Sequence, residues 1–205
     1  MNHRAKENQK KARKRILALL KKLKKVYDVY DDLDTANEII NEIRSILNQY
    51  GTDLPPNVKQ SLDTLTSITD TTPEGIKNFM NLVETTLKTT IQILPNGIPL
   101  LALVGIGVGA ALAITVAVSI LSMVEIYVIN KGCQISDTTI QALPIQINVD
   151  ATSSGTITVS GMGFSHSINV PSHIKKVEFD GTSLLGNNVQ FDLGSQKRHE
   201  LIITC

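Results

Sequence analysis

The sequence of 205 residues has no tryptophan and only two cysteines, Cys133 and Cys205. Two cysteines are too few for a disulfide-rich scaffold, and they leave open one bridge or two free thiols. There is no Asn-x-Ser/Thr site for N-glycosylation. We expect no secretory signal peptide, because the apolar stretch Ile16–Leu20 is short and lysines follow it from Lys21 onward.

Charge is also missing from the middle of the chain, where no charged residue lies between Thr89 and Val124. Within this region Ile98–Val124 is an apolar run of 27 residues. As a helix it would measure roughly 40 Å, more than the roughly 30 Å of a bilayer core. The run therefore predicts a transmembrane helix within residues 95–131. We expect four residues near the membrane–water interface: Glu125, Tyr127, Asn130 and Lys131.

Two other interpretations of this run compete with a membrane span. One is a buried core helix, although such helices are usually shorter and amphipathic. The other is a dinucleotide-binding turn, because residues 105–110 fit the pattern G-x-G-x-x-A and Glu125 follows about 20 residues later. That fold needs further alternating strands and helices, and no amphipathic helix is visible after residue 130.

Small residues recur at every fourth position of the run: Gly105, Gly109, Ala113 and Ala117. This spacing lets two helix backbones approach closely, and packing is what holds membrane helices together. The pattern predicts that copies of the chain associate through this stripe.

The N-terminal part is basic and helical. The first 25 residues contain 11 Lys or Arg and one acidic residue, Glu7. From Ile16 to Tyr50 apolar residues recur at steps of three and four, which is typical of a coiled coil or helical bundle. A capping pattern at residues 35–38 predicts a break near Asp34, with helices of about 8–33 and 36–50. Two further helices are expected to begin near Pro55-Pro56 and at Thr72-Pro73-Glu74.

The basic N-terminal residues need a partner or solvent for their charge. Three interpretations stay open: duplex DNA phosphates, anionic lipid headgroups, or a solvated helix face. No aromatic residue precedes Tyr27, which argues against single-stranded nucleic acid. The candidate contact residues are Lys10, Lys11, Arg13, Lys14, Arg15, Lys21, Lys22, Lys24 and Lys25.

After Cys133 short segments of alternating or clustered apolar residues are separated by turn residues, which predicts a small antiparallel β-sandwich over residues 132–205. Asp180-Gly181 is a hairpin signal. A Cys133–Cys205 bridge would close this domain end to end. His166, His173 and His199 show no metal-ligand spacing. We therefore expect no catalytic residue, metal or cofactor, and no enzyme.

The predicted fold is an α+β membrane protein, with a basic amphipathic helix in 1–33, a helical region in 34–94, one transmembrane helix and the β-sandwich. The segment GIPLLALVGIGVGAALAITVAVSI and the Thr/Ser/Gly-rich strands resemble structural membrane proteins of archaeal spindle-shaped viruses. The resemblance implies a virion role, with the helix in the lipid envelope, the β-domain against tail or coat subunits, and the basic arm on packaged DNA.

The expected function is therefore a structural, oligomeric, membrane-anchored protein with its N-terminus inside and its C-terminus outside. Its expected partners are membrane lipid, other copies of the chain, neighbouring structural subunits and double-stranded DNA. One alternative is a membrane-active fusion or penetration protein, because the Gly/Ala-rich segment resembles a fusion peptide. A second is a cellular surface protein whose β-domain binds a ligand.

Overall fold

The computed structural model describes residues 3–29, 33–49, 54–67, 72–87, 107–194 and 196–205. The chain divides into two compact units. The helical unit comprises residues 1–54 and 65–122, and the β unit comprises residues 55–64 and 123–205.

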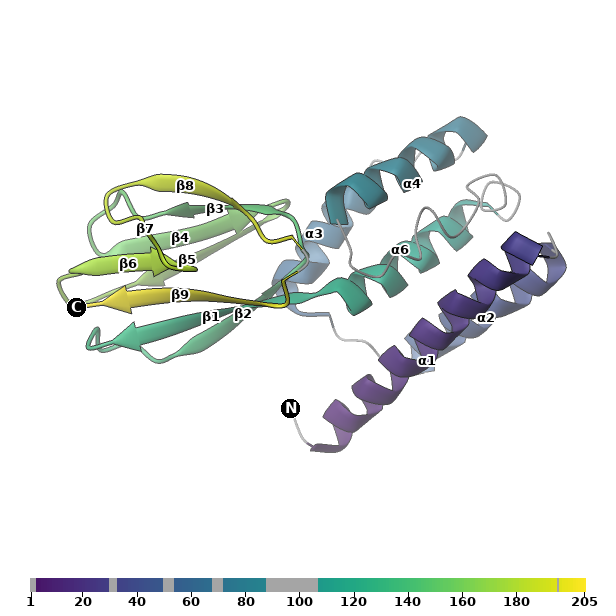
Figure 1. Cartoon of the computed structure of the whole chain (residues 1–205), viewed down its shortest axis with the longest axis horizontal. Coiled ribbons are helices and arrows are strands. Elements are labelled where there is room, and N and C mark those ends of the chain that lie inside the picture. Colours follow the sequence, from purple (N-terminus) through teal and green to yellow (C-terminus); the bar gives the residue numbers. More distant parts are fainter. Residues whose placement is uncertain (1–2, 30–32, 50–53, 68–71, 88–106, 195) are drawn as a thin grey trace. The chain divides into compact units, whose positions relative to one another are not determined.

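The described part of the chain contains five helices (Figure 1). They are α1 (His3–Val29), α2 (Leu33–Gln49), α3 (Pro56–Thr66), α4 (Pro73–Leu87) and α6 (Val108–Ser122). The apolar seam predicted from the sequence is buried in α1 and α2, which contact each other. Its buried members are Ile16, Leu19, Leu23, Val26, Ala36, Ile40 and Ile43. The break between α1 and α2 lies a few residues before the predicted position near Asp34.

Helix α4 begins where the sequence predicts. The backbone N–H of Gly75 donates to Thr72 Oγ1 at 3.0 Å, so Thr72 caps the helix and Pro73 occupies its first position. Its apolar side chains Ile76, Phe79 and Val83 are buried.

Helix α6 forms the apolar centre of the helical unit. It has no charged residue, ten of its 15 residues are buried, and it contacts α1, α2 and α4. Two buried hydroxyls are satisfied within the helix, since Thr115 Oγ1 donates to Ala111 O at 2.8 Å and Ser119 Oγ donates to Thr115 O at 2.7 Å. A helix that is apolar on all sides is stable in water only when its neighbours enclose it.

The β unit is built from nine strands in two sheets, counted over the described residues (Figure 1). They are β1 (Val124–Lys131), β2 (Thr138–Ala142), β3 (Gln146–Asp150), β4 (Thr156–Gly161), β5 (Phe164–Asn169), β6 (Lys176–Phe179), β7 (Thr182–Ser183), β8 (Asn188–Asp192) and β9 (Arg198–Thr204). The strand orders are β2-β1-β9-β6-β7 and β5-β4-β3-β8. Phe179 of the first sheet meets Phe191 of the second with ring centroids 4.5 Å apart, so the core lies between the sheets.

The turn between β6 and β7 confirms the predicted hairpin. Asp180 has φ 47° and Gly181 has φ 84°, which are the left-handed central positions of a type I′ turn. Phe179 pairs with Thr182 across the turn.

The prediction of a transmembrane helix is wrong. None of the helices in the described residues is both long and apolar enough to cross a membrane. Helix α6 ends at Ser122, and its 15 residues rise about 22 Å, less than a bilayer core of about 30 Å. The C-terminal part of the predicted span is a strand instead, so the residues placed at a membrane interface lie in β1: Glu125, Tyr127, Asn130 and Lys131. The start of the predicted span, residues 95–106, lies outside the described residues.

The β-sandwich also differs from the prediction in its strand directions. It begins at β1 rather than after residue 131, and β1 pairs in parallel with β9, with Val128 opposite Leu201. The sheet is therefore mixed rather than purely antiparallel. Part of α3 belongs to the same unit, where Ser61 Oγ donates to Met162 O at 2.6 Å at the turn between β4 and β5.

Candidate nucleic-acid interface

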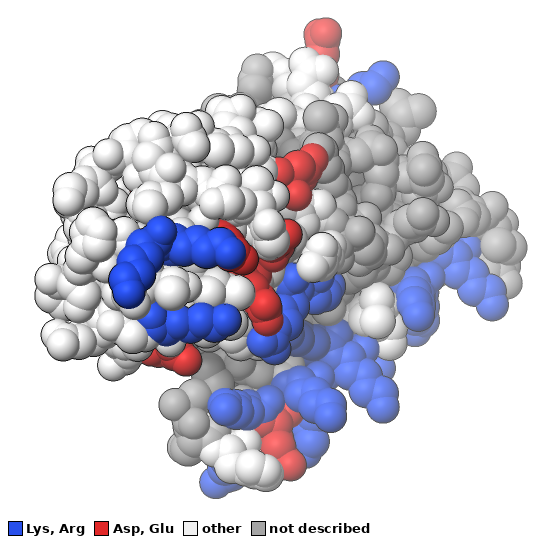
Figure 2. Space-filling view, turned by 60° about the vertical axis from the view of Figure 1, so that its left-hand side comes forward, with Lys and Arg blue, Asp and Glu red and all other residues white. Residues whose placement is uncertain are grey.

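Helix α1 carries the basic residues that the sequence singles out. Ten of its Lys and Arg side chains are exposed: Arg4, Lys6, Lys10, Lys11, Arg13, Lys14, Arg15, Lys21, Lys22 and Lys25. The side chain of Lys24 lies outside the described set. Figure 2 shows several Lys and Arg side chains gathered on one part of the surface, with few acidic side chains among them. The structure thus brings the predicted contact residues onto one continuous helix of about 40 Å.

The opposite side of α1 is occupied by packing within the helical unit. Six apolar side chains of this helix are buried: Ala12, Ile16, Leu19, Leu20, Leu23 and Val26. At 100° per residue they cover an arc of roughly 120°, which leaves most of the remaining circumference to basic and polar residues. Arg15 forms an ion pair with Glu42 of α2 across the edge of this contact. The basic side chains of the helix are therefore exposed to solvent, while its apolar side chains are packed inside the helical unit.

The described residues of the small-residue stripe lie within the helical unit. Ala113 and Ala117 of α6 are buried, and a Cβ atom on Gly109 would lie 2.7 Å from Arg44 Nη2 of α2. Gly105 lies outside the described residues. Small side chains here let neighbouring helices of the same chain approach α6 closely. Association of copies through the stripe stays a prediction.

The two cysteines form a disulfide that joins the loop after β1 to the residue after β9. The Cα atoms of Cys133 and Cys205 are 5.0 Å apart, and the bridge closes a sequence separation of 72 residues. The parallel pairing of β1 and β9 explains the proximity, because Lys131 lies opposite Thr204 and each cysteine follows shortly after. The backbone N–H of Cys205 also donates to Lys131 O at 3.0 Å.

Among the described residues no group of three His, Cys, Asp or Glu side chains is close enough to hold a metal ion. His199 is buried, its Nδ1 lies 2.6 Å from Asp180 Oδ2, and its Nε2 lies 3.0 Å from Gln196 O. Asp180 Oδ1 accepts from the backbone N–H of Glu200 at 2.8 Å. These contacts tie the turn after β6 to β9, so we assign His199 a structural role.

One feature of the β unit was missed by the sequence reasoning. Three loops, 151–155, 170–174 and 184–187, surround a hollow of about 490 Å³. The loops are separated in the sequence by entire strands and share no motif. Their spacing therefore did not predict a common site. Only the sheet topology brings them together.

The chain was compared with protein-family models, with curated proteins and with solved structures, and none of them matches it.

Proposed function

We propose that this protein is a structural, DNA-contacting component of an assembly such as a virion, in which α1 binds the phosphate backbone of duplex DNA and the β unit contacts neighbouring subunits. The observation that carries the proposal is the exposed basic face of α1, which runs along a helix anchored by its apolar face. Contacts to phosphate need no sequence-reading residues, only closely spaced cations that release counterions on binding.

The burial of the apolar face of α1 favours DNA over a lipid surface as partner. A helix that binds at a membrane interface inserts its apolar side among the acyl chains. In this protein Ile16, Leu20 and Leu23 are 0% exposed within the helical unit. Inserting them into lipid would require α1 to leave its neighbours α2 and α6. Binding to phosphates uses only the exposed side and leaves the packing intact.

The proposal is tested by binding of the full chain to a short mixed-sequence DNA duplex, measured by fluorescence anisotropy over salt concentrations of about 50 to 200 mM. Replacing Lys10, Lys11 and Lys14 with Glu should weaken binding strongly and reduce the slope of log K against log salt by about 3, because about three phosphate contacts are lost.

A matched control is the variant in which Lys59, Lys77 and Lys175 are replaced with Glu. These lysines are exposed, lie outside α1, and give the same change in net charge. The control should retain nearly all of the affinity. Equal loss in both variants would show that net charge alone drives binding, and tighter binding to phosphatidylserine vesicles than to DNA would contradict the choice of partner.

A further inference from the structure

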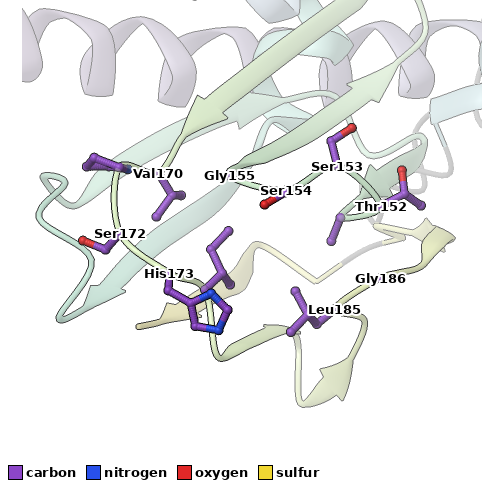
Figure 3. A pocket seen from close by; sticks show the side chains of 12 residues that line it. Thr152, Ser153, Ser154, Gly155, Val170, Ser172, His173, Leu185 and Gly186 are labelled. Atoms are coloured by element: carbon purple, nitrogen blue, oxygen red, sulfur yellow. The ribbon is translucent and has the colours of Figure 1, made fainter.

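The hollow in the β unit lies where three loops meet at one end of the two sheets. Figure 3 shows Thr152, Ser153 and Ser154 of the β3–β4 loop, Ser172 and His173 of the β5–β6 loop, and Leu185 of the β7–β8 loop around it. Its volume of about 490 Å³ lies within the roughly 300–1,000 Å³ typical of small-molecule sites. Loops clustered at the end of a β-sandwich are also a common place for binding.

The loops that surround the hollow are fixed to one another by backbone hydrogen bonds. Gly186 N–H donates to Ala151 O and Ala151 N–H donates to Asn187 O, both at 2.9 Å. Val170 N–H donates to Gly155 O at 2.7 Å. A hollow with tied walls loses little conformational entropy when a ligand enters, which favours binding.

The polar lining divides into side chains that already have partners and side chains that face the hollow without one. The hydroxyl of Thr152 donates to Asp150 Oδ1 at 2.6 Å, and that of Ser172 donates to Cys133 O at 3.4 Å. Among the described residues, no hydrogen bond or ion pair is formed by the side chains of Ser153, Ser154 or His173, and all three are exposed. They can donate to and accept from a ligand.

The remaining lining is apolar or neutral. Val170, Ile174 and Leu185 contribute hydrocarbon, and Leu185 is the exposed large hydrophobic residue in the described part of the chain, at 42%. Among the residues that the structure describes, no Lys, Arg, Asp or Glu lines the hollow. A phosphate, carboxylate or ammonium group placed there would therefore find no permanently charged side chain of opposite sign.

We propose that this hollow binds a short neutral saccharide. Sugar hydroxyls match the free hydroxyls of Ser153 and Ser154 and the imidazole of His173, while the C–H face of a sugar ring packs against Leu185 and Val170. This site is independent of the basic face of α1, so the two proposals can fail separately.

The test is saturation-transfer difference NMR on the full chain with maltotriose, mannobiose and chitobiose as probes and glucose 6-phosphate as a charged comparison. At least one neutral saccharide should give transfer signals. The double variant His173→Ala with Leu185→Ser should bind that saccharide about tenfold more weakly or worse, because it removes a hydrogen-bonding group and an apolar wall. Ser154→Trp, which fills the hollow, should abolish binding.

The matched control is Thr182→Ala with Gln190→Ala, two exposed positions of the same unit that do not line the hollow. Its affinity should equal that of the original chain, and circular dichroism of every variant establishes that the strands are retained. The proposal is overturned if none of the three saccharides binds, if the control loses as much affinity as the double variant, or if glucose 6-phosphate binds best.

Discussion

In the helical unit the core is an uncharged helix, α6, that packs against α1, α2 and α4. In the β unit the core lies between two hydrogen-bonded sheets, and a disulfide links the residues that follow β1 and β9 of one sheet. The two cores are adjacent in sequence, since α6 ends at Ser122 and β1 begins at Val124. Similar apolar residues therefore stabilise the chain in two ways: through side-chain packing between helices in one unit, and through packing with inter-strand hydrogen bonds and a covalent link in the other.

The largest effect is expected from a substitution that unfolds the helical core and leaves the β unit folded. Ile114 of α6 is 0% exposed, and Ile114→Asp would place an unpaired carboxylate among apolar side chains. We expect a loss of roughly 4 kcal/mol or more in the free energy of unfolding of the helical unit. Residue-resolved hydrogen exchange should show lost protection in α6 and retained protection in β9.

The control for this change is Ile114→Val, which removes one methylene and should cost about 1 kcal/mol. If Ile114→Asp lowered the hydrogen-exchange protection of β9 as much as that of α6, the two units would unfold together. They would then not have separate cores.

The next effect acts on the β unit alone. Replacing Cys133 and Cys205 with Ala removes a bridge across a sequence separation of 72 residues. In the chain-entropy model this costs about 4 kcal/mol of unfolding free energy, because the unfolded chain gains freedom. The midpoint of denaturant unfolding of the strands should fall, while that of the helices stays the same.

Dithiothreitol provides the matching check on the disulfide. It should lower the midpoint of the original chain to that of the double variant and leave the double variant unchanged. A strand midpoint that does not respond to reductant would show that the bridge adds no stability.

The smallest effect concerns a single carboxylate at the end of β3. The hydroxyl and the backbone N–H of Thr152 both donate to Asp150, and these hydrogen bonds hold the pKa of its carboxyl below the usual value. A folded-state pKa that is lowered contributes stability above the unfolded-state pKa of about 4, and this contribution is lost as the pH falls through the folded-state pKa.

Carboxyl chemical shifts followed by NMR during an acid titration give the pKa of Asp150. Thr152→Val, which removes the hydroxyl donor, should raise it towards the usual value. In Asp150→Asn the part of the acid destabilisation due to this group should disappear. A titration curve that Thr152→Val leaves unchanged would exclude the hydrogen bond as the cause.

Local patterns were sufficient to predict much of both units. The apolar spacing of α1 and α2, the cap at Thr72 and the hairpin at Asp180-Gly181 depend on neighbours a few residues apart, and the structure has all of them. The short strands separated by turn residues, expected after Cys133, are also present as β2 to β9.

The errors arose where the outcome depends on distant partners. An uncharged apolar helix is compatible with lipid or with a protein interior, and α1, α2 and α4 supply that interior for α6. Strand β1 was assigned to the end of the same helix, at the membrane interface, because it directly follows the uncharged run. In β1 the buried residues Val124, Ile126 and Val128 alternate with half-buried ones. This alternation identifies a strand only once the pairing with β2 and β9 is known.

The sequence by itself determined the basic surface of α1, the segments able to form helices and strands, and the presence of two cysteines beyond the uncharged run. These properties follow from composition and short-range spacing. The tertiary structure decided that α6 is enclosed by helices, that Cys133 meets Cys205, and that three separate loops form one hollow. Each of these depends on contacts between residues far apart in the chain, which no local pattern specifies.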